Sequence, residues 1–120
     1  MANKPTEYNR QRIAKVIEYI EEHYTERISQ QEVAQHFGFT KEYFARVFHN
    51  TTGKTFMEYV NDYRLDAAKE LLSNTDQKVM DIGEACGFAD TRGFINAFQR
   101  YYEVTPLQYR KNVRKGSSAS

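Results

Sequence analysis

Hydrophobic residues recur along this chain with the spacing of helices. Between about residues 9 and 24 they stand at positions i, i+3, i+4, i+7 and i+11, beginning at Ile13 and ending at Tyr24. This period places them on one face of an amphipathic helix. The sequence has no stretch in which hydrophobic and polar residues alternate over the length of a strand. The pattern therefore predicts an all-α fold of about seven helices.

Capping residues mark where several later helices begin. Ser29 and Glu32 form a capping box, in which a side-chain oxygen accepts a hydrogen bond from a free backbone N–H group of the first turn. Thr55 and Glu58 repeat this pattern. Pro106 follows another capping residue, and proline is favoured at the first position of a helix. These signals predict helices that begin near residues 30, 56 and 106.

Two segments of the chain repeat a helix–turn–helix pattern in register. Up to the turn the copies lie 49 residues apart, as Gly38 and Gly87 do, and one extra residue follows the second turn. The matched positions include Val33 with Ile82, Ala34 with Gly83, Phe39 with Phe88, Thr40 with Asp90, Phe44 with Phe94, and Phe48 with Phe98. This is the sequence shape of a DNA-reading helix-turn-helix motif.

Each matched position has a physical reason. The two turn glycines can adopt the positive φ that a helix C-terminus often requires. The small Ala34 and Gly83 allow two helices to cross closely. Thr40 and Asp90 can cap the helix that follows the turn. The repeat therefore predicts two modules of the same construction.

The predicted elements are three helices, one long helix and three more helices. They give an N-terminal helix-turn-helix subdomain over residues 9–53, a linker helix over 55–73 and a C-terminal helix-turn-helix subdomain over 77–113. Residues 1–8 and 114–120 are expected to be flexible ends. A linker of this length spans about 28 Å, which is near the ~34 Å between successive major grooves of B-DNA.

Composition narrows the class of protein. The net charge is only +1, so any DNA contact must depend on individual side chains and helix N-termini. No run approaches the ~18 to 20 apolar residues of a membrane span, and the N-terminus has no signal-peptide core. A single cysteine, Cys86, fits a reducing compartment. These features predict a cytoplasmic protein without membrane contact.

The helices after the two turns each have a hydrophobic face and an opposite, mostly polar face. The inward faces are expected to hold Phe44, Val47, Phe48 and Thr51 in the first module, and Phe94, Ala97, Phe98 and Tyr101 in the second. The outward faces hold Glu42, Ala45, Arg46 and His49 in the first, and Arg92, Ile95, Asn96 and Gln99 in the second. These outward residues are candidate DNA contacts.

A further set of spaced residues extends across the linker and the second module: Arg64-Leu65, Ala67-Ala68, Leu71-Leu72, Val79, Ile82-Gly83, Gly87-Phe88, Phe94, Phe98, Tyr101, Thr105-Pro106 and Tyr109-Arg110. With the repeat, this set resembles the DNA-binding domain of the AraC/XylS transcription regulators over about residues 9–113. The resemblance implies two helix-turn-helix modules, a duplex DNA partner, control of transcription and, in activators, contact with RNA polymerase.

The resemblance also implies which residues read bases. The family's positions match Glu42, Ala45 and Arg46 in the first module, and Thr91, Arg92, Ile95 and Asn96 in the second. They agree with the outward faces except at Thr91, which lies to the side and is expected near a phosphate. Additional phosphate candidates are Lys41, Arg100, Arg110 and Lys111.

The candidate side chains suit different bases. Arg46 and Arg92 can donate paired hydrogen bonds to guanine O6 and N7, and Asn96 suits adenine. Ile95 can pack against a thymine methyl group. Glu42 can accept from cytosine N4 or orient Arg46.

These observations predict a sequence-specific DNA-binding transcription regulator, an activator, whose single chain reads an asymmetric site. The chain is expected to be a monomer, or a dimer if a sensor domain belongs to a longer protein. The alternative is a helical protein-interaction module without DNA binding, which the near-neutral charge would suit. Salt-dependent binding to duplex DNA distinguishes the two.

An enzyme, a cofactor and a metal site are not predicted. No Ser/His/Asp or Cys/His arrangement, paired carboxylates or glycine-rich phosphate loop can be placed. His23, His36 and His49 show no clustering of metal ligands. Cys86 falls at a core position, and Arg64 is expected to pair within the linker helix.

Overall fold

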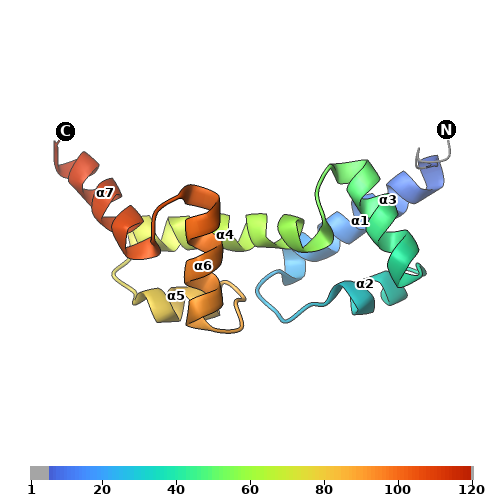
Figure 1. Ribbon diagram of the computed structural model, residues 1–120, viewed down its shortest axis with the longest axis horizontal. Coiled ribbons are helices and arrows are strands. Elements are labelled where there is room, and N and C mark those ends of the chain that lie inside the picture. The colour runs from blue at the N-terminus through green and yellow to red at the C-terminus, as the bar shows by residue number, and fades with distance from the viewer. Residues whose placement is uncertain (1–5, 120) are drawn as a thin grey trace. The chain divides into compact units, whose positions relative to one another are not determined.

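The computed structural model describes residues 6–119, with side chains up to residue 115. Within this range the chain forms seven helices and no strand, so the all-α prediction is confirmed. The helices are α1 (Glu7–His23), α2 (Gln30–His36), α3 (Lys41–Thr52), α4 (Phe56–Asn74), α5 (Val79–Ala85), α6 (Thr91–Tyr102) and α7 (Pro106–Ala119) (Figure 1). Their starts lie within about two residues of the predicted ones, the usual uncertainty of helix ends.

The helices form two compact units, unit 1 (Met1–Asn61) and unit 2 (Asp62–Ser120). The division falls inside α4, the helix expected as a linker. Phe56 and Val60, in its first part, are buried, and the Phe56 ring lies 5.6 Å from that of Phe44 in unit 1. Leu65 and Leu72, further along, belong to the core of unit 2. The helix is therefore part of two hydrophobic cores.

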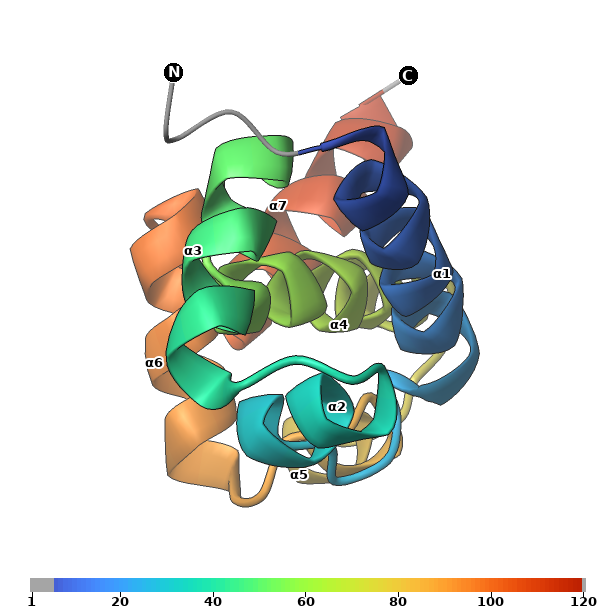
Figure 2. The same cartoon turned by 90° about the vertical axis from the view of Figure 1, so that its right-hand side faces the viewer.

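Unit 1 is built around the contacts of α3 with α1 and α2, and the three helices can be followed in Figure 2. From α1, Ile13, Val16 and Ile20 are completely buried, as their helical spacing predicts. From α3, the rings of Phe44 and Phe48 lie 5.6 Å apart at the centre of this core. The inward face predicted for α3 is thus confirmed at its aromatic positions.

In unit 2, α6 contacts α5 and α7 and contributes Phe94 and Phe98 to the core. The prediction that Tyr101 faces inward is wrong, because its side chain is 38% exposed. Tyr102 packs on this core instead, with its ring 4.7 Å from that of Phe98. The reason is geometric: Phe94, Phe98 and Tyr102 follow one i, i+4 row, and this row faces the core.

The structure extends the internal repeat beyond the part that the sequence reveals. In unit 1, the helix before the motif is α1, and in unit 2 the same place is taken by α4 from Asp62 onward. Their fully buried residues correspond at a constant offset: Ile13 with Leu65, Val16 with Ala68, and Ile20 with Leu72. The repeated part of each unit is therefore a set of three helices: α1, α2 and α3 in unit 1, and α4 from Asp62 onward, α5 and α6 in unit 2.

Both turns have the geometry that the sequence predicts. Gly38 and Gly87 have φ values of 78° and 106°, in the left-handed region that favours glycine. The next residue in each turn returns a backbone hydrogen bond to the preceding helix, from Phe39 N to the Ala34 carbonyl and from Phe88 N to the Gly83 carbonyl. These bonds satisfy carbonyl groups that the end of a helix leaves free.

The predicted caps of α3 and α6 are also confirmed. The Thr40 hydroxyl accepts from the Tyr43 backbone N–H at 3.3 Å, and the Asp90 carboxylate accepts from that of Gly93 at 2.7 Å. These caps fix where each of the two helices begins. The residues just after each cap therefore project from a well-defined helix N-terminus.

The ends of the chain were expected to be flexible over residues 1–8 and 114–120. Residues 1–5 and 120 lie outside the described part. Thr6 caps α1, which begins at Glu7, and α7 extends to Ala119. The described residues of both ends are therefore helical or capping.

Candidate nucleic-acid interface

The predicted contact residues of α3 lie together on its outward face. Lys41, Glu42, Ala45, Arg46 and His49 are all exposed. On the opposite side of the same helix, Phe44, Val47 and Phe48 are buried. Because the buried row holds the helix against α1 and α2, the outward side chains are presented from a fixed support.

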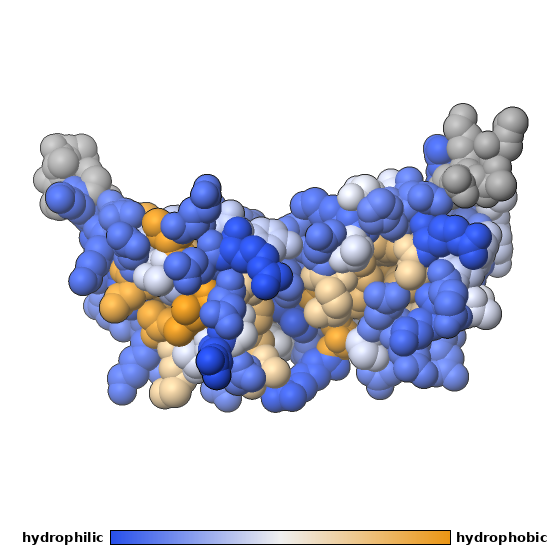
Figure 3. Space-filling view, viewed as in Figure 1, coloured by the Kyte–Doolittle hydropathy of each residue, from blue (hydrophilic) through white to orange (hydrophobic). Residues whose placement is uncertain are grey.

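The second set lies on α6, and most of it is exposed: Arg92, Asn96, Gln99 and Arg100. Thr91 and Ile95 are half-buried. Seen from the side shown in Figure 3, much of unit 1 is hydrophilic, and the strongest hydrophobic colouring lies on unit 2. Ile95 is the one apolar residue among these contact candidates of α6, and its exposed part can contact an apolar group of a ligand.

On α3, the Arg46 guanidinium is associated with an aromatic ring. Its Cζ lies 5.6 Å from the ring centroid of Tyr43, one turn earlier. Glu42 forms no ion pair among the residues that the structure describes. In the described part of the chain, Arg46 therefore lies beside Tyr43 and forms no ion pair with Glu42.

A polar network that the sequence analysis missed ties α1 to α3. Asn9 is 5% exposed, and its Nδ2 donates to the Tyr43 hydroxyl at 2.8 Å. Its Oδ1 accepts from Arg12 at 3.2 Å, and Arg12 also donates to the Phe37 carbonyl. One signal was present in the sequence: Asn9 is a polar residue four positions before Ile13, on the hydrophobic face of α1.

Arg110, predicted to bind phosphate, has a different role. Its Nε donates to the Leu72 carbonyl and its Nη2 to the Thr75 carbonyl, both at 3.0 Å. Arg114 joins it by donating to Thr75 and pairing with Asp76 at 2.8 Å. The last carbonyls of a helix need donors, and α7 supplies them for α4. Arg110 is therefore a structural residue of unit 2, which corrects the prediction, whereas Lys111 is exposed.

Arg64 and Cys86 also lie within unit 2. Arg64 is 6% exposed, with its guanidinium 5.8 Å from the Phe88 ring centroid, and burial lowers its pKa. Cys86 is 1% exposed, and burial raises the pKa of its thiol to about 11. The core position predicted for Cys86 is therefore confirmed, and its thiol is protonated at neutral pH.

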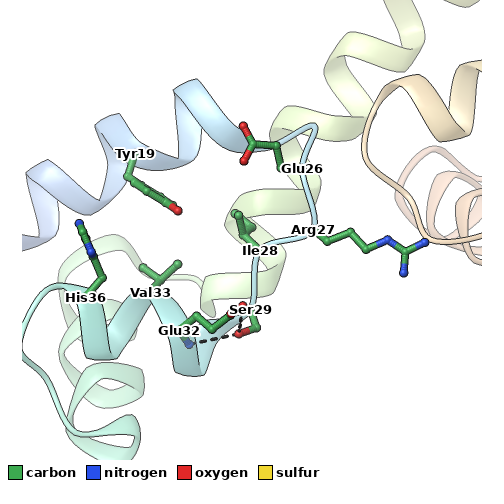
Figure 4. Close-up of a pocket in the computed structure, with 8 residues that line it drawn as sticks. All are labelled: Tyr19, Glu26, Arg27, Ile28, Ser29, Glu32, Val33 and His36. Atoms are coloured by element: carbon green, nitrogen blue, oxygen red, sulfur yellow. Dashed lines mark hydrogen bonds between the residues drawn. The ribbon is translucent and has the colours of Figure 1, made fainter.

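A hollow of about 270 Å³ opens beside the loop between α1 and α2 (Figure 4). It is lined by Tyr19, Glu26, Arg27, Ile28, Ser29, Glu32, Val33 and His36. Two of these, Ser29 and Glu32, hydrogen-bond to each other as the cap of α2, and the Arg27 side chain points away from the hollow. No predicted DNA-contact residue lines it, so it is separate from the candidate interface.

Two further properties concern the described residues only. No group of three or more His, Cys, Asp or Glu side chains is placed to hold a metal ion. No helix in this part of the chain is both long and apolar enough to cross a membrane.

Comparison with known proteins gives consistent matches. A family model described as a helix-turn-helix domain matches residues 33–112. The HTH-type transcriptional regulator YijO of Escherichia coli is 37% identical over 94 residues, which are 78% of this chain and 33% of YijO. The HTH-type transcriptional activator RhaS of an Enterobacter species is 33% identical over 114 residues, which are 95% of this chain and 40% of RhaS. The chain thus spans less than half the length of these curated relatives.

Two solved structures match this chain over most of their own length. The C-terminal domain of the two-component response regulator YesN from Fusobacterium nucleatum has a TM-score of 0.78 at 33% identity, covering 81% of this chain and 95% of that one. The DNA-binding domain of the transcriptional factor AdpA, solved with a target DNA, has a TM-score of 0.83 at 24% identity, covering 90% and 97%. Two helix-turn-helix units, the matching family model and these relatives together show that the chain belongs to the AraC/XylS family of DNA-binding transcription regulators.

Proposed function

We propose that the chain binds duplex DNA sequence-specifically by placing α3 and α6 in successive major grooves. The observation that carries this proposal is the division of both helices into a buried aromatic row and an exposed face with base-reading chemistry. A major groove admits one α-helix, and the first residues of a recognition helix contact base edges. The caps at Thr40 and Asp90 define where those first residues stand.

The proposed base contacts follow from the chemistry of each side chain. Arg46 and Arg92 donate paired hydrogen bonds to guanine, and Asn96 pairs with the edge of adenine. Ile95 packs on a thymine methyl group. Glu42 accepts from cytosine N4, since no cation in the described chain pairs with it. Phosphate contacts come from side chains beside these: Lys41, His49, Thr91, Gln99, Arg100 and Lys111.

The wider role that we propose is activation of transcription. RhaS, 33% identical to this chain, is named as an activator, and the partner that we propose for activation is RNA polymerase. The named relatives are bacterial, and bacterial DNA lies in the cytoplasm, so we propose that this chain acts there. The curated relatives are longer than this chain, so a longer protein could also contain a sensor domain. We propose that this chain alone binds DNA as a monomer, and that a protein with such a sensor domain binds as a dimer.

The test is selection of bound sites from random duplexes, followed by affinity measurements with Arg46→Ala and Arg92→Ala. Each substitution should weaken specific binding by about 1–3 kcal/mol and relax the preference at one patch of the site. The matched control is Arg27→Ala, which removes an exposed arginine outside the candidate interface. Melting temperatures should be unchanged for all three variants, since the side chains are exposed.

The near-neutral charge makes a protein-interaction module the competing function. A DNA-binding domain should lose affinity steeply as salt rises, because bound phosphates release counterions. Absence of any preferred duplex, or affinity insensitive to salt, would favour the interaction module and contradict the proposal.

A further inference from the structure

We infer that Asn9 is a positioning residue for base recognition by unit 1. Its amide holds the Tyr43 ring in place against the Arg46 guanidinium, and the ring sets the direction in which Arg46 reaches a base. This inference rests on the proposed function, since it concerns how Arg46 selects its base pair. Asn9 itself is almost completely buried in α1 and does not touch DNA.

The orientation of the Asn9 amide is determined by its two neighbours. Arg12 can only donate hydrogen bonds, so the oxygen of the Asn9 amide must face it. The amide nitrogen then faces the Tyr43 hydroxyl, to which it donates at 2.8 Å. Both ends of the Asn9 side chain are therefore engaged, and the amide has one orientation.

Arg12 is in turn fixed by the turn between α2 and α3. It donates to the carbonyl of Phe37, and its Cζ lies 3.6 Å from the ring centroid of Phe39. A Cβ atom at Gly38 would lie 3.2 Å from the Arg12 guanidinium, so the turn and the arginine are in close contact. The network that ends at Tyr43 thus starts from the backbone of the helix-turn-helix motif.

Tyr43 connects this buried network to the exposed face of α3. Its hydroxyl is held by Asn9, yet the side chain is 41% exposed, and its ring lies within cation–π distance of Arg46. A free arginine side chain samples many rotamers, and paired hydrogen bonds to guanine require one plane of the guanidinium. A fixed ring beside Arg46 favours the rotamers whose guanidinium faces that ring.

The described residues of unit 2 provide no ring at the matching position, so unit 2 serves as an internal comparison. In the repeat, Gly93 takes the place of Tyr43 and Asn96 takes the place of Arg46. Gly93 has no ring to place beside a base-reading side chain. The loss of Asn9 should therefore change base preference where Arg46 reads and leave it unchanged where Asn96 reads.

The experiment measures equilibrium binding to three duplexes: the selected site, the site changed at the base pair assigned to Arg46, and the site changed at the pair assigned to Asn96. Each of these two base pairs is identified beforehand as the position of the site at which Arg46→Ala or Asn96→Ala loses its base preference. Asn9→Ala and Tyr43→Leu should lower discrimination at the Arg46 pair about two- to fivefold, as expected for an exposed cation–π contact. Discrimination at the Asn96 pair should not change.

Three controls separate positioning from folding. Asn9→Asp should keep the discrimination, because a carboxylate can accept from the Tyr43 hydroxyl and pair with Arg12. Tyr43→Phe keeps the ring and loses only the hydroxyl, so it should lower discrimination at the Arg46 pair, as Asn9→Ala does. If Asn9→Ala does not fold, the result for Tyr43→Phe tests the inference in its place. In an Arg46→Ala background, Asn9→Ala should cause no further loss of discrimination.

Two results would overturn the inference while leaving the proposed function intact. One is unchanged discrimination at the Arg46 pair in folded Asn9→Ala and Tyr43→Leu. The other is an equal loss of affinity for all three duplexes, which would indicate a purely structural role or a phosphate contact. Failure of the proposed function is distinguishable, because the unaltered chain would then prefer no duplex, and both proposals would be rejected.

Discussion

At the scale of single residues, Gly83 shows how closely two helices approach in unit 2. A Cβ atom added there would lie 2.8 Å from Cδ2 and 2.9 Å from Cγ of the Phe94 ring. Phe94 is completely buried, so its ring can move aside only if the closely packed core around it also shifts. Unit 1 has Ala34 at the corresponding place, also buried, so its helices accommodate one methyl group more.

Gly83→Ala should therefore destabilise the protein even though alanine favours helices. The overpacking cost of about 1–3 kcal/mol opposes a gain in helix propensity of about 1 kcal/mol. The free energy of unfolding, measured by urea denaturation, should fall. The smaller side chain of Phe94→Leu should relieve the clash, so the double variant should lose less stability than the sum of the two single variants. Additive losses would place the cause elsewhere.

Two ionisable side chains of unit 2, the buried Cys86 and the half-buried Tyr102, should make its stability sensitive to alkaline pH. Burial raises the pKa of Cys86 from 9.0 to about 11. The pKa of Tyr102 rises from 10.0 to about 12, first through burial and then through Asp66 and Asp62. Because the unfolded chain loses these protons at lower pH, their contribution to stability is complete below about pH 9 and is lost as the pH rises.

The free energy of unfolding should consequently fall between about pH 9 and pH 12. Cys86→Ala should make this fall less steep in the lower part of the pH range, from about pH 9, independently of its effect on stability at pH 7. Urea denaturation followed by circular dichroism over this pH range gives the slopes. An identical slope in Cys86→Ala would show that the thiol does not titrate differently on unfolding.

At the scale of elements, two neighbouring cations of α7 have different surroundings. Arg110 donates two hydrogen bonds to the carbonyl end of α4, whereas Lys111, the next residue, is exposed. A helix rotates by about 100° per residue, so adjacent side chains point in different directions. Of these two adjacent basic residues, Arg110 therefore stabilises unit 2, whereas Lys111 is available at the surface.

Arg110→Met should lower the free energy of unfolding by about 1–3 kcal/mol, because carbonyl groups of Leu72 and Thr75 lose a charged donor. Lys111→Met, the matched control, should change stability by less than about 0.5 kcal/mol. Its effect should appear instead in DNA binding, as a salt dependence reduced by about one phosphate contact. If Arg110→Met instead changed the salt dependence of DNA binding and left stability unchanged, Arg110 would be a phosphate contact after all.

At the scale of the whole molecule, one chain contains two units whose outward faces on α3 and α6 carry different residues. Simple helix-turn-helix proteins dimerise to present two recognition helices, and their sites are palindromic. Here the second recognition helix belongs to the same chain, and α4, with 19 residues, contributes to both units. The outward faces of α3 and α6 are unlike, so an asymmetric site is expected.

One molecule should protect a single asymmetric site of about 20 base pairs. The mass of the complex in solution, combined with footprinting on the selected site, measures this. If only one unit docks, the footprint should shrink to about half, and substitutions in the other unit should have no effect. A complex of two chains on a palindromic site would falsify the prediction that one chain binds two successive grooves.

The sequence by itself determined the features that depend on neighbouring residues. The periodicity around Ile13 and the capping pattern at Ser29 specify helices, because helical hydrogen bonds and caps join residues three or four apart. The turn glycines Gly38 and Gly87 are likewise specified, since only a local positive φ is needed. The candidate contact faces of α3 and α6 followed from the same periodicity.

The tertiary structure alone decided the features that join distant residues. Asn9 meets Tyr43 across 34 positions, and Arg110 meets Leu72 across 38, so no local pattern could pair them. The choice of Tyr102 over Tyr101 also depended on where the core of unit 2 lies. Periodicity assigns a face to each helix, but only the packing of other elements against that face decides which polar groups become partners.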